Sequence, residues 1–120
     1  MRVLLADDHA KVRQALRMFL EEEPGMSIVG EVAAAVPLVD QVRALRPDII
    51  LLEWALQGQS GNTLLRALRA LDPAIRVIVL SSRPEYEQAA LAAGADEFVG
   101  KANGPEQLLA VLRRLMEGEG

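Results

Sequence analysis

The fold of this chain is restricted most narrowly by four aliphatic residues that are followed by a carboxylate. Residues 49–52 read Ile-Ile-Leu-Leu, Pro47 precedes them by two positions, and Glu53 comes directly after them. An unbroken apolar run of this length is typical of a strand that is buried on both faces of a parallel sheet. In such sheets, ligands bind outside the carboxyl ends of the strands. Glu53 is therefore a candidate site residue from its position alone.

Four further apolar runs and five helical patterns surround this strand. Residues 3–6, 27–32, 75–80 and 97–100 predict strands, of which 27–32 is the least apolar and so nearer an edge. Strands that alternate with helices imply right-handed crossovers and a parallel sheet. We therefore predict an α/β, flavodoxin-like (βα)5 sandwich, with strand order 2-1-3-4-5 and helices on both faces. The predicted helices run from His9 to Pro24, from Leu38 to Pro47, from Ser60 to Leu71, from Pro84 to Ala93 and from Pro105 to Leu115.

Length and charge exclude several classes of protein. The 120 residues fit one domain, which we place at residues 1–117, with 118–120 as the start of a linker or tail. The absence of cysteine excludes disulfides and thiolate metal sites, and the net charge of -4 with mixed signs gives no footprint for nucleic acid. The chain begins directly with a strand, without a signal peptide, and no apolar run reaches membrane-spanning length. We expect a cytoplasmic protein without membrane contact.

Polar residues follow most of the predicted strands. Asp7 and Asp8 follow the first, Glu53 the third, Ser81 the fourth and Lys101 the fifth. A parallel sheet brings these residues to one edge, where three carboxylates raise one another's pKa unless a cation intervenes. Oxygen ligands suit a hard ion such as Mg²⁺, and a lysine with a hydroxyl suits phosphoryl oxygens. The set predicts a site that handles phosphoryl groups.

The sequence resembles the receiver (CheY-like) domains of bacterial two-component response regulators over residues 1 to about 117. The matching pieces are Leu-Ala-Asp-Asp-His at 5–9, Arg-Pro-Asp-Ile-Ile-Leu-Leu at 46–52, Val-Ile-Val-Leu-Ser at 77–81, Ala-Gly-Ala-Asp at 93–96, and Lys101. The likeness is greatest to receivers that precede a LuxR/NarL-type helix-turn-helix output domain.

The resemblance implies a role for each polar residue at the sheet edge. In the family, two acids help to hold Mg²⁺, and an aspartate takes a phosphoryl group from a histidine kinase. A lysine then contacts the phosphate, a hydroxyl turns toward it, and an aromatic ring rotates inward behind it. The matching residues are Asp7 and Asp8 for the metal, Glu53 at the phospho-acceptor position, Lys101 for the phosphate contact, and Ser81 and Phe98 for the switch.

Glu53 departs from the family pattern, which has aspartate at this position. The extra methylene moves the carboxylate by about 1 Å or more, a misplacement that can cost about 10²-fold in a positioned reaction. We therefore expect no phosphotransfer to Glu53, and Mg²⁺ binding that is weakened or lost. The family usually has a proline near Gln57 and an acid near Ser60. These changes favour natural divergence of the whole loop over a single introduced phosphomimic.

Two roles for Glu53 are compatible with the sequence. Its longer arm could imitate the phosphorylated acid with one negative charge, instead of the ~1.5 to 2 of a phosphoryl group, and so give a permanent partial bias toward the active state. Alternatively, it could form an ion pair with Lys101 and leave the module unable to switch.

Simpler structural roles also fit several of these residues. Asp8 could cap the first helix, Phe98 could belong to the core, and Trp54 could shield the site or simply pack. His9 is expected to be an exposed residue of the first helical turn. The alanine-rich helix from Pro84 to Ala93 should be the loosest element because its apolar face is sparse.

The leading functional hypothesis is a non-enzymatic, atypical receiver domain of a phosphorelay that controls a transcriptional output through its fourth helix, fifth strand and fifth helix. The resemblance implies a sensor histidine kinase, here vestigial, or another regulatory protein as partner. It also implies a DNA-binding output domain outside this chain and a homodimer through the fourth or fifth helix. The alternatives are a small Mg²⁺-dependent phosphohydrolase using Asp7, Asp8 and Glu53, and a flavodoxin-like cofactor binder, which the few aromatic residues disfavour.

Overall fold

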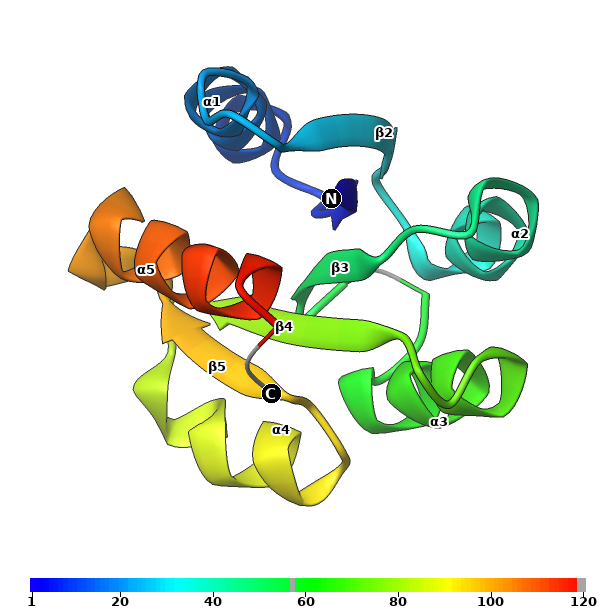
Figure 1. The fold of residues 1–120 in the computed structure, drawn as a ribbon. Helices are drawn as coiled ribbons and strands as arrows, with labels where there is room; N and C mark the ends of the chain where they lie inside the picture. The colour runs from blue at the N-terminus through cyan, green and yellow to red at the C-terminus, as the bar shows by residue number, and fades with distance from the viewer. Residues whose placement is uncertain (57, 119–120) are drawn as a thin grey trace.

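The computed structural model describes residues 1–56 and 58–118 and contains one five-stranded sheet. All strands are parallel, and their order across the sheet is β2-β1-β3-β4-β5 (Figure 1). The predicted fold and strand order are therefore confirmed. Gln57 of the predicted loop and residues 119 and 120 of the predicted tail lie outside the described residues. The strands are β1 (Arg2–Ala6), β2 (Ser27–Val32), β3 (Ile49–Glu53), β4 (Arg76–Ser81) and β5 (Glu97–Gly100).

The helices cover both faces of the sheet. In Figure 1, α1 and α5 lie on one side, and α2, α3 and α4 lie on the other. Within the described residues, no helix combines the length and the apolar character that crossing a membrane requires. The predicted fourth helix is shorter than expected, since Pro84–Tyr86 forms a 3₁₀ turn before the α-helix begins. The helices are α1 (Ala10–Glu21), α2 (Ala35–Leu45), α3 (Gly61–Leu71), α4 (Glu87–Ala92) and α5 (Pro105–Met116).

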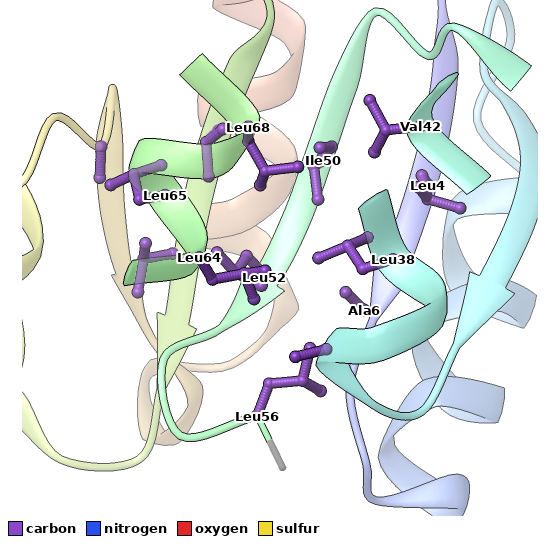
Figure 2. Packing of buried hydrophobic residues seen from close by; sticks show 14 of the residues in the cluster. Leu4, Ala6, Leu38, Val42, Ile50, Leu52, Leu56, Leu64, Leu65 and Leu68 are labelled. Atoms are coloured by element: carbon purple, nitrogen blue, oxygen red, sulfur yellow. The ribbon is translucent and has the colours of Figure 1, made fainter. Parts of the chain in front are cut away.

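Strand β3 forms the centre of the core, and all five of its residues are buried. Because side chains alternate along a strand, Ile50 and Leu52 pack beneath α2 and α3 (Figure 2), whereas Ile49 and Leu51 pack beneath α1 and α5. This two-sided burial explains the unbroken apolar run in the sequence. By contrast, β2 lies at an edge of the sheet and is mostly half-buried, as its more polar composition predicted.

The connection from β3 to α3 is held by Ser60 and Trp54. The Ser60 hydroxyl accepts a hydrogen bond from the Thr63 backbone N–H at 3.2 Å, so Ser60 is the N-cap of α3. The Trp54 ring is partly buried and packs with the core residues under α2 and α3. It lies so close to Gly61 that a Cβ at that position would collide with the indole. The tryptophan is therefore a packing residue of this connection.

Candidate functional site

The register of the sheet brings the predicted site residues to one edge. Ala6 pairs with Leu52, Glu53 with Leu80, and Ser81 with Gly100, so β1, β3, β4 and β5 end side by side. The residues that end or follow these strands are therefore neighbours at the carboxyl edge of the sheet.

Lys101 lies between two carboxylates at this edge. Its ammonium donates to Asp7 Oδ2 at 2.6 Å and also to Glu53 Oε1. The side chains of Asp7 and Glu53 are only 3% and 6% exposed, and that of Lys101 is 17% exposed. The three side chains thus form a nearly buried group with two negative charges and one positive charge, which we call the lysine cluster.

The environment of Lys101 keeps its amine protonated. Burial on its own would lower the pKa of Lys101, but the hydrogen bonds to Asp7 and Glu53 and their negative charges outweigh this effect. The pKa of Lys101 is therefore raised above its ordinary value. The lysine supplies a cation to two of the three carboxylates that were predicted to need one, Asp7 and Glu53.

The second oxygen of each carboxylate in the lysine cluster is held by the backbone. Asp7 Oδ1 accepts from the His9 N–H at 2.8 Å, and Glu53 Oε2 accepts from the Ala55 N–H at 3.1 Å. Both acids therefore use both of their carboxylate oxygens within the chain. A metal ion at this point would have to share these oxygens with the donors that already bind them.

Asp7, Asp8 and His9 form a second group next to the lysine cluster. One ligand atom from each residue lies within 4.8 Å of the others, so the three could hold a metal ion. Asp8 Oδ1 is buried and has no hydrogen bond within the described residues. It lies 3.2 Å from His9 Nδ1, but this contact lacks hydrogen-bond geometry. A spare buried carboxylate oxygen is what a bound cation would use.

The sequence did not indicate that His9 lies beside the acids, although it is 65% exposed as predicted. Its Nδ1 is turned toward both Asp7 Oδ1 and Asp8 Oδ1, at 3.2 Å from each. The available signal was its position directly after two acids. Asp8 does not cap α1, because His9 occupies the N-cap position and no side chain caps the helix there.

Ser81 and Phe98, the two predicted switch residues, lie in different surroundings. The buried Ser81 hydroxyl accepts from the Arg83 N–H at 3.1 Å, and no hydrogen bond joins it to Glu53 or Lys101 within the described residues. Phe98 is half-buried and packs against the core cluster under α2, α3 and α4. The hydroxyl therefore faces the loop after β4 and does not complete the lysine cluster.

A doubly wound parallel sheet with acids and a lysine at its carboxyl edge defines a receiver-type α/β domain. The sequence model of the response regulator receiver domain family matches residues 3–113, and the chain belongs to this family. Its relatives place it in the LuxR/NarL-type branch of two-component response regulators.

The relatives that this chain matches are longer proteins, of which it covers only a part. The nitrate/nitrite response regulator protein NarP of Escherichia coli is 33% identical over 98% of this chain, which spans 55% of NarP. A protein-glutamate methylesterase/protein-glutamine glutaminase of Myxococcus xanthus is 39% identical over 83% of this chain, which spans 30% of that protein. The chain thus corresponds to about half or less of these relatives.

Solved structures agree closely with the fold. A LuxR-family two-component response regulator from Aurantimonas has a TM-score of 0.91 at 30% identity, with 98% of this chain and 86% of that chain covered. RcsB of Salmonella enterica bound to a promoter has a TM-score of 0.90 at 26% identity, with 98% of this chain and 60% of that chain covered.

Proposed function

We propose that this chain is an atypical receiver domain that acts without phosphorylation, with Glu53 at the acceptor position. The observation that carries the proposal is the contact of the Lys101 ammonium with Glu53 and Asp7 in a nearly buried site. The lysine that contacts the phosphate in related receivers is here already satisfied by carboxylates. The carboxylates of Asp7 and Glu53 therefore occupy the lysine contacts that a phosphoryl group would otherwise use.

Of the two roles open to Glu53, the contacts favour the ion pair that does not switch. Both Glu53 oxygens are engaged, one by Lys101 and one by the Ala55 N–H. An imitation of the phosphorylated state would draw the Ser81 hydroxyl toward the carboxylate. The Ser81 hydroxyl instead accepts from the Arg83 N–H. We propose that Glu53 holds the domain in one state and does not bias it toward the active one.

We propose that Mg²⁺ binding is weakened but that one possible ligand atom remains free to bind the ion. Asp8 Oδ1 is buried without a hydrogen bond and could take a ligand position. Asp7 and Glu53 each have one oxygen paired with the Lys101 ammonium, so a metal bound to either acid would lie beside a fixed positive charge. A cation at this site would supply charge that offsets the carboxylates, which Lys101 already does. The chain's own residues therefore compete with the metal.

The partners proposed for the domain follow from its relatives. NarP and the LuxR-family regulator are response regulators, and RcsB is a relative bound to DNA. We propose a non-enzymatic module that acts on a DNA-binding output domain, or on another regulatory protein, through α4, β5 and α5. A sensor histidine kinase would dock without transferring phosphate, and α4 or α5 would form any homodimer.

Incubation with Mg²⁺ and acetyl phosphate, followed by intact-mass measurement, tests the proposal. We expect no phosphoryl adduct on the chain, because Glu53 is displaced by a methylene and held by Lys101. Glu53→Asp should form an adduct, and Glu53→Gln serves as the matched control that should not. A stoichiometric adduct on Glu53 itself would overturn the proposal. Turnover of p-nitrophenyl phosphate with Mg²⁺ would instead favour a phosphohydrolase.

A further inference from the structure

Asp7 lies in the short connection between β1 and α1, yet every one of its polar atoms is bonded. Its N–H donates to the Val32 carbonyl at 3.0 Å, and its two carboxylate oxygens accept from the His9 N–H and from Lys101. The remaining polar atom is the Asp7 backbone carbonyl, which accepts from the guanidinium of Arg13. Outside the lysine cluster, two side chains reach Asp7 within the described residues: His9 Nδ1 lies 3.2 Å from Asp7 Oδ1, and Arg13 binds the backbone carbonyl. Arg13 is the one that holds the Asp7 main chain.

Arg13 is itself held by Glu31 on the edge strand β2. Arg13 Nε donates to Glu31 Oε1 at 3.0 Å, and Arg17 donates to the other Glu31 oxygen. The side chains of Arg13 and Glu31 are 19% and 24% exposed, so the pair is shielded from most of the solvent. A guanidinium can serve two acceptors at once because its donors are arranged in a planar fork. Arg13 therefore connects β2 to the Asp7 backbone.

The charges around Glu31 agree with a firmly held pair. Burial on its own would raise the pKa of Glu31, but the hydrogen bonds from Arg17 and Arg13 lower it overall. The carboxylate therefore stays ionised near neutral pH, where it can bind both guanidinium groups. Glu31 pairs with Leu5 in the sheet register, one residue before the end of β1. Glu31 thus lies beside the end of β1, which Asp7 directly follows.

We propose that Arg13, supported by Glu31, is a positioning residue that sets the Asp7 carboxylate against Lys101. The inference rests on the proposed function, in which the lysine cluster occupies the site. Arg13 touches neither Lys101 nor Glu53 in the contacts of the described residues, so it acts through the Asp7 main chain. Loss of Arg13 should free the β1–α1 connection, let Asp7 move, and leave Lys101 with a weaker hold.

Arg17 provides a matched control on the same helix. It binds Glu31 as Arg13 does, but it reaches Glu21 where Arg13 reaches Asp7. Arg13→Gln and Arg17→Gln each remove one charge and one Glu31 contact, and glutamine keeps a good helix-forming side chain. Arg13→Gln should lose more stability in urea than Arg17→Gln, because it also loses the contact with the Asp7 carbonyl. Only Arg13→Gln should change the lysine cluster.

The chain contains two lysines, Lys11 and Lys101, so amine labelling has an internal reference. Lys11 is exposed, whereas Lys101 is held by two carboxylates. The probe is N-hydroxysuccinimidyl acetate at one fixed pH, with the extent of acetylation at each lysine read by peptide mass spectrometry. We expect slow labelling of Lys101 relative to Lys11 in the unsubstituted protein. In Arg13→Gln, labelling of Lys101 should rise about fivefold, the factor that one net hydrogen bond is worth.

The outcomes separate the inference from the proposed function. Arg17→Gln should leave Lys101 labelling within about twofold, because a partly exposed ion pair contributes little. Protection of Lys101 that is unchanged in Arg13→Gln, or equal effects in the two variants, would overturn the positioning role alone. Labelling of Lys101 as fast as Lys11 in the unsubstituted protein would overturn the lysine cluster and the inference with it.

Discussion

Replacement of Lys101 by methionine removes the only ammonium of the lysine cluster and keeps an apolar stem of similar length. Two nearly buried carboxylates, Asp7 and Glu53, then face each other without a counter-charge. Breaking a buried ion pair by removing one partner costs about 3–5 kcal/mol. Because Lys101 keeps 17% of its side chain exposed, water can reach the site, and we expect the lower end of this range.

A loss of about 3 kcal/mol is a large part of the ~5–15 kcal/mol that stabilises a domain, and it should lower the unfolding midpoint by about 10 °C. Urea unfolding followed by the fluorescence of Trp54 measures the change directly. Lys11→Met is the control, and this exposed substitution should cost less than about 0.5 kcal/mol.

A second substitution tests whether charge is the cause. Glu53→Gln in the Lys101→Met background removes one of the two unpaired charges and keeps an oxygen that can accept from the Ala55 N–H. This double variant should recover about 1–2 kcal/mol relative to Lys101→Met alone. A loss below about 1 kcal/mol in Lys101→Met, or no recovery in the double variant, would refute the reasoning that Lys101 offsets two buried carboxylates.

Three further outcomes are expected. The raised pKa of Lys101 adds stability that is fully present below lysine's ordinary pKa of 10.5 and is lost as pH rises through the folded-state pKa. Above about pH 10, the free energy of unfolding measured in urea should therefore fall more for the unsubstituted protein than for Lys101→Met. The lowered pKa of Glu31 adds stability that is present above 4.5 and is lost as pH falls through the folded-state value, so the acid unfolding curves of the unsubstituted protein and Glu31→Gln should converge at low pH. Gly61→Ala should cost about 1–3 kcal/mol and alter Trp54 emission, because the added Cβ collides with the indole; unchanged emission would argue against that contact.

The sequence was sufficient for the architecture because each element carried its own periodicity. The unbroken run at residues 49–52 predicted a strand covered on both faces, and β3 is buried on both. The polar composition of 27–32 predicted an edge, which β2 occupies. Parallel strands then placed the candidate residues at one edge of the sheet without further information. Local pattern and global topology agree in this chain.

The details of the site were less accessible because they depend on how single side chains turn. Nothing in the sequence fixes whether the Ser81 hydroxyl faces Glu53 or the Arg83 N–H. His9 looked like an ordinary residue of a first turn, and only its Nδ1 direction joins it to the acids. The role of Arg13 depends on an edge strand 18 residues further along the chain. Such contacts follow from tertiary packing and not from periodicity.

The lysine cluster joins residues that are far apart in the sequence and are therefore synthesised at different times. Asp7 and Lys101 are separated by 94 residues, and Glu53 lies 48 residues before Lys101. During synthesis the two acids emerge long before their cation, so the carboxyl edge of a partly made sheet would repel itself. Lys101, which follows β5, therefore offsets this repulsion only after all five strands have been made. A truncated chain that stops before residue 101 would keep both carboxylates and lack the ammonium that offsets them.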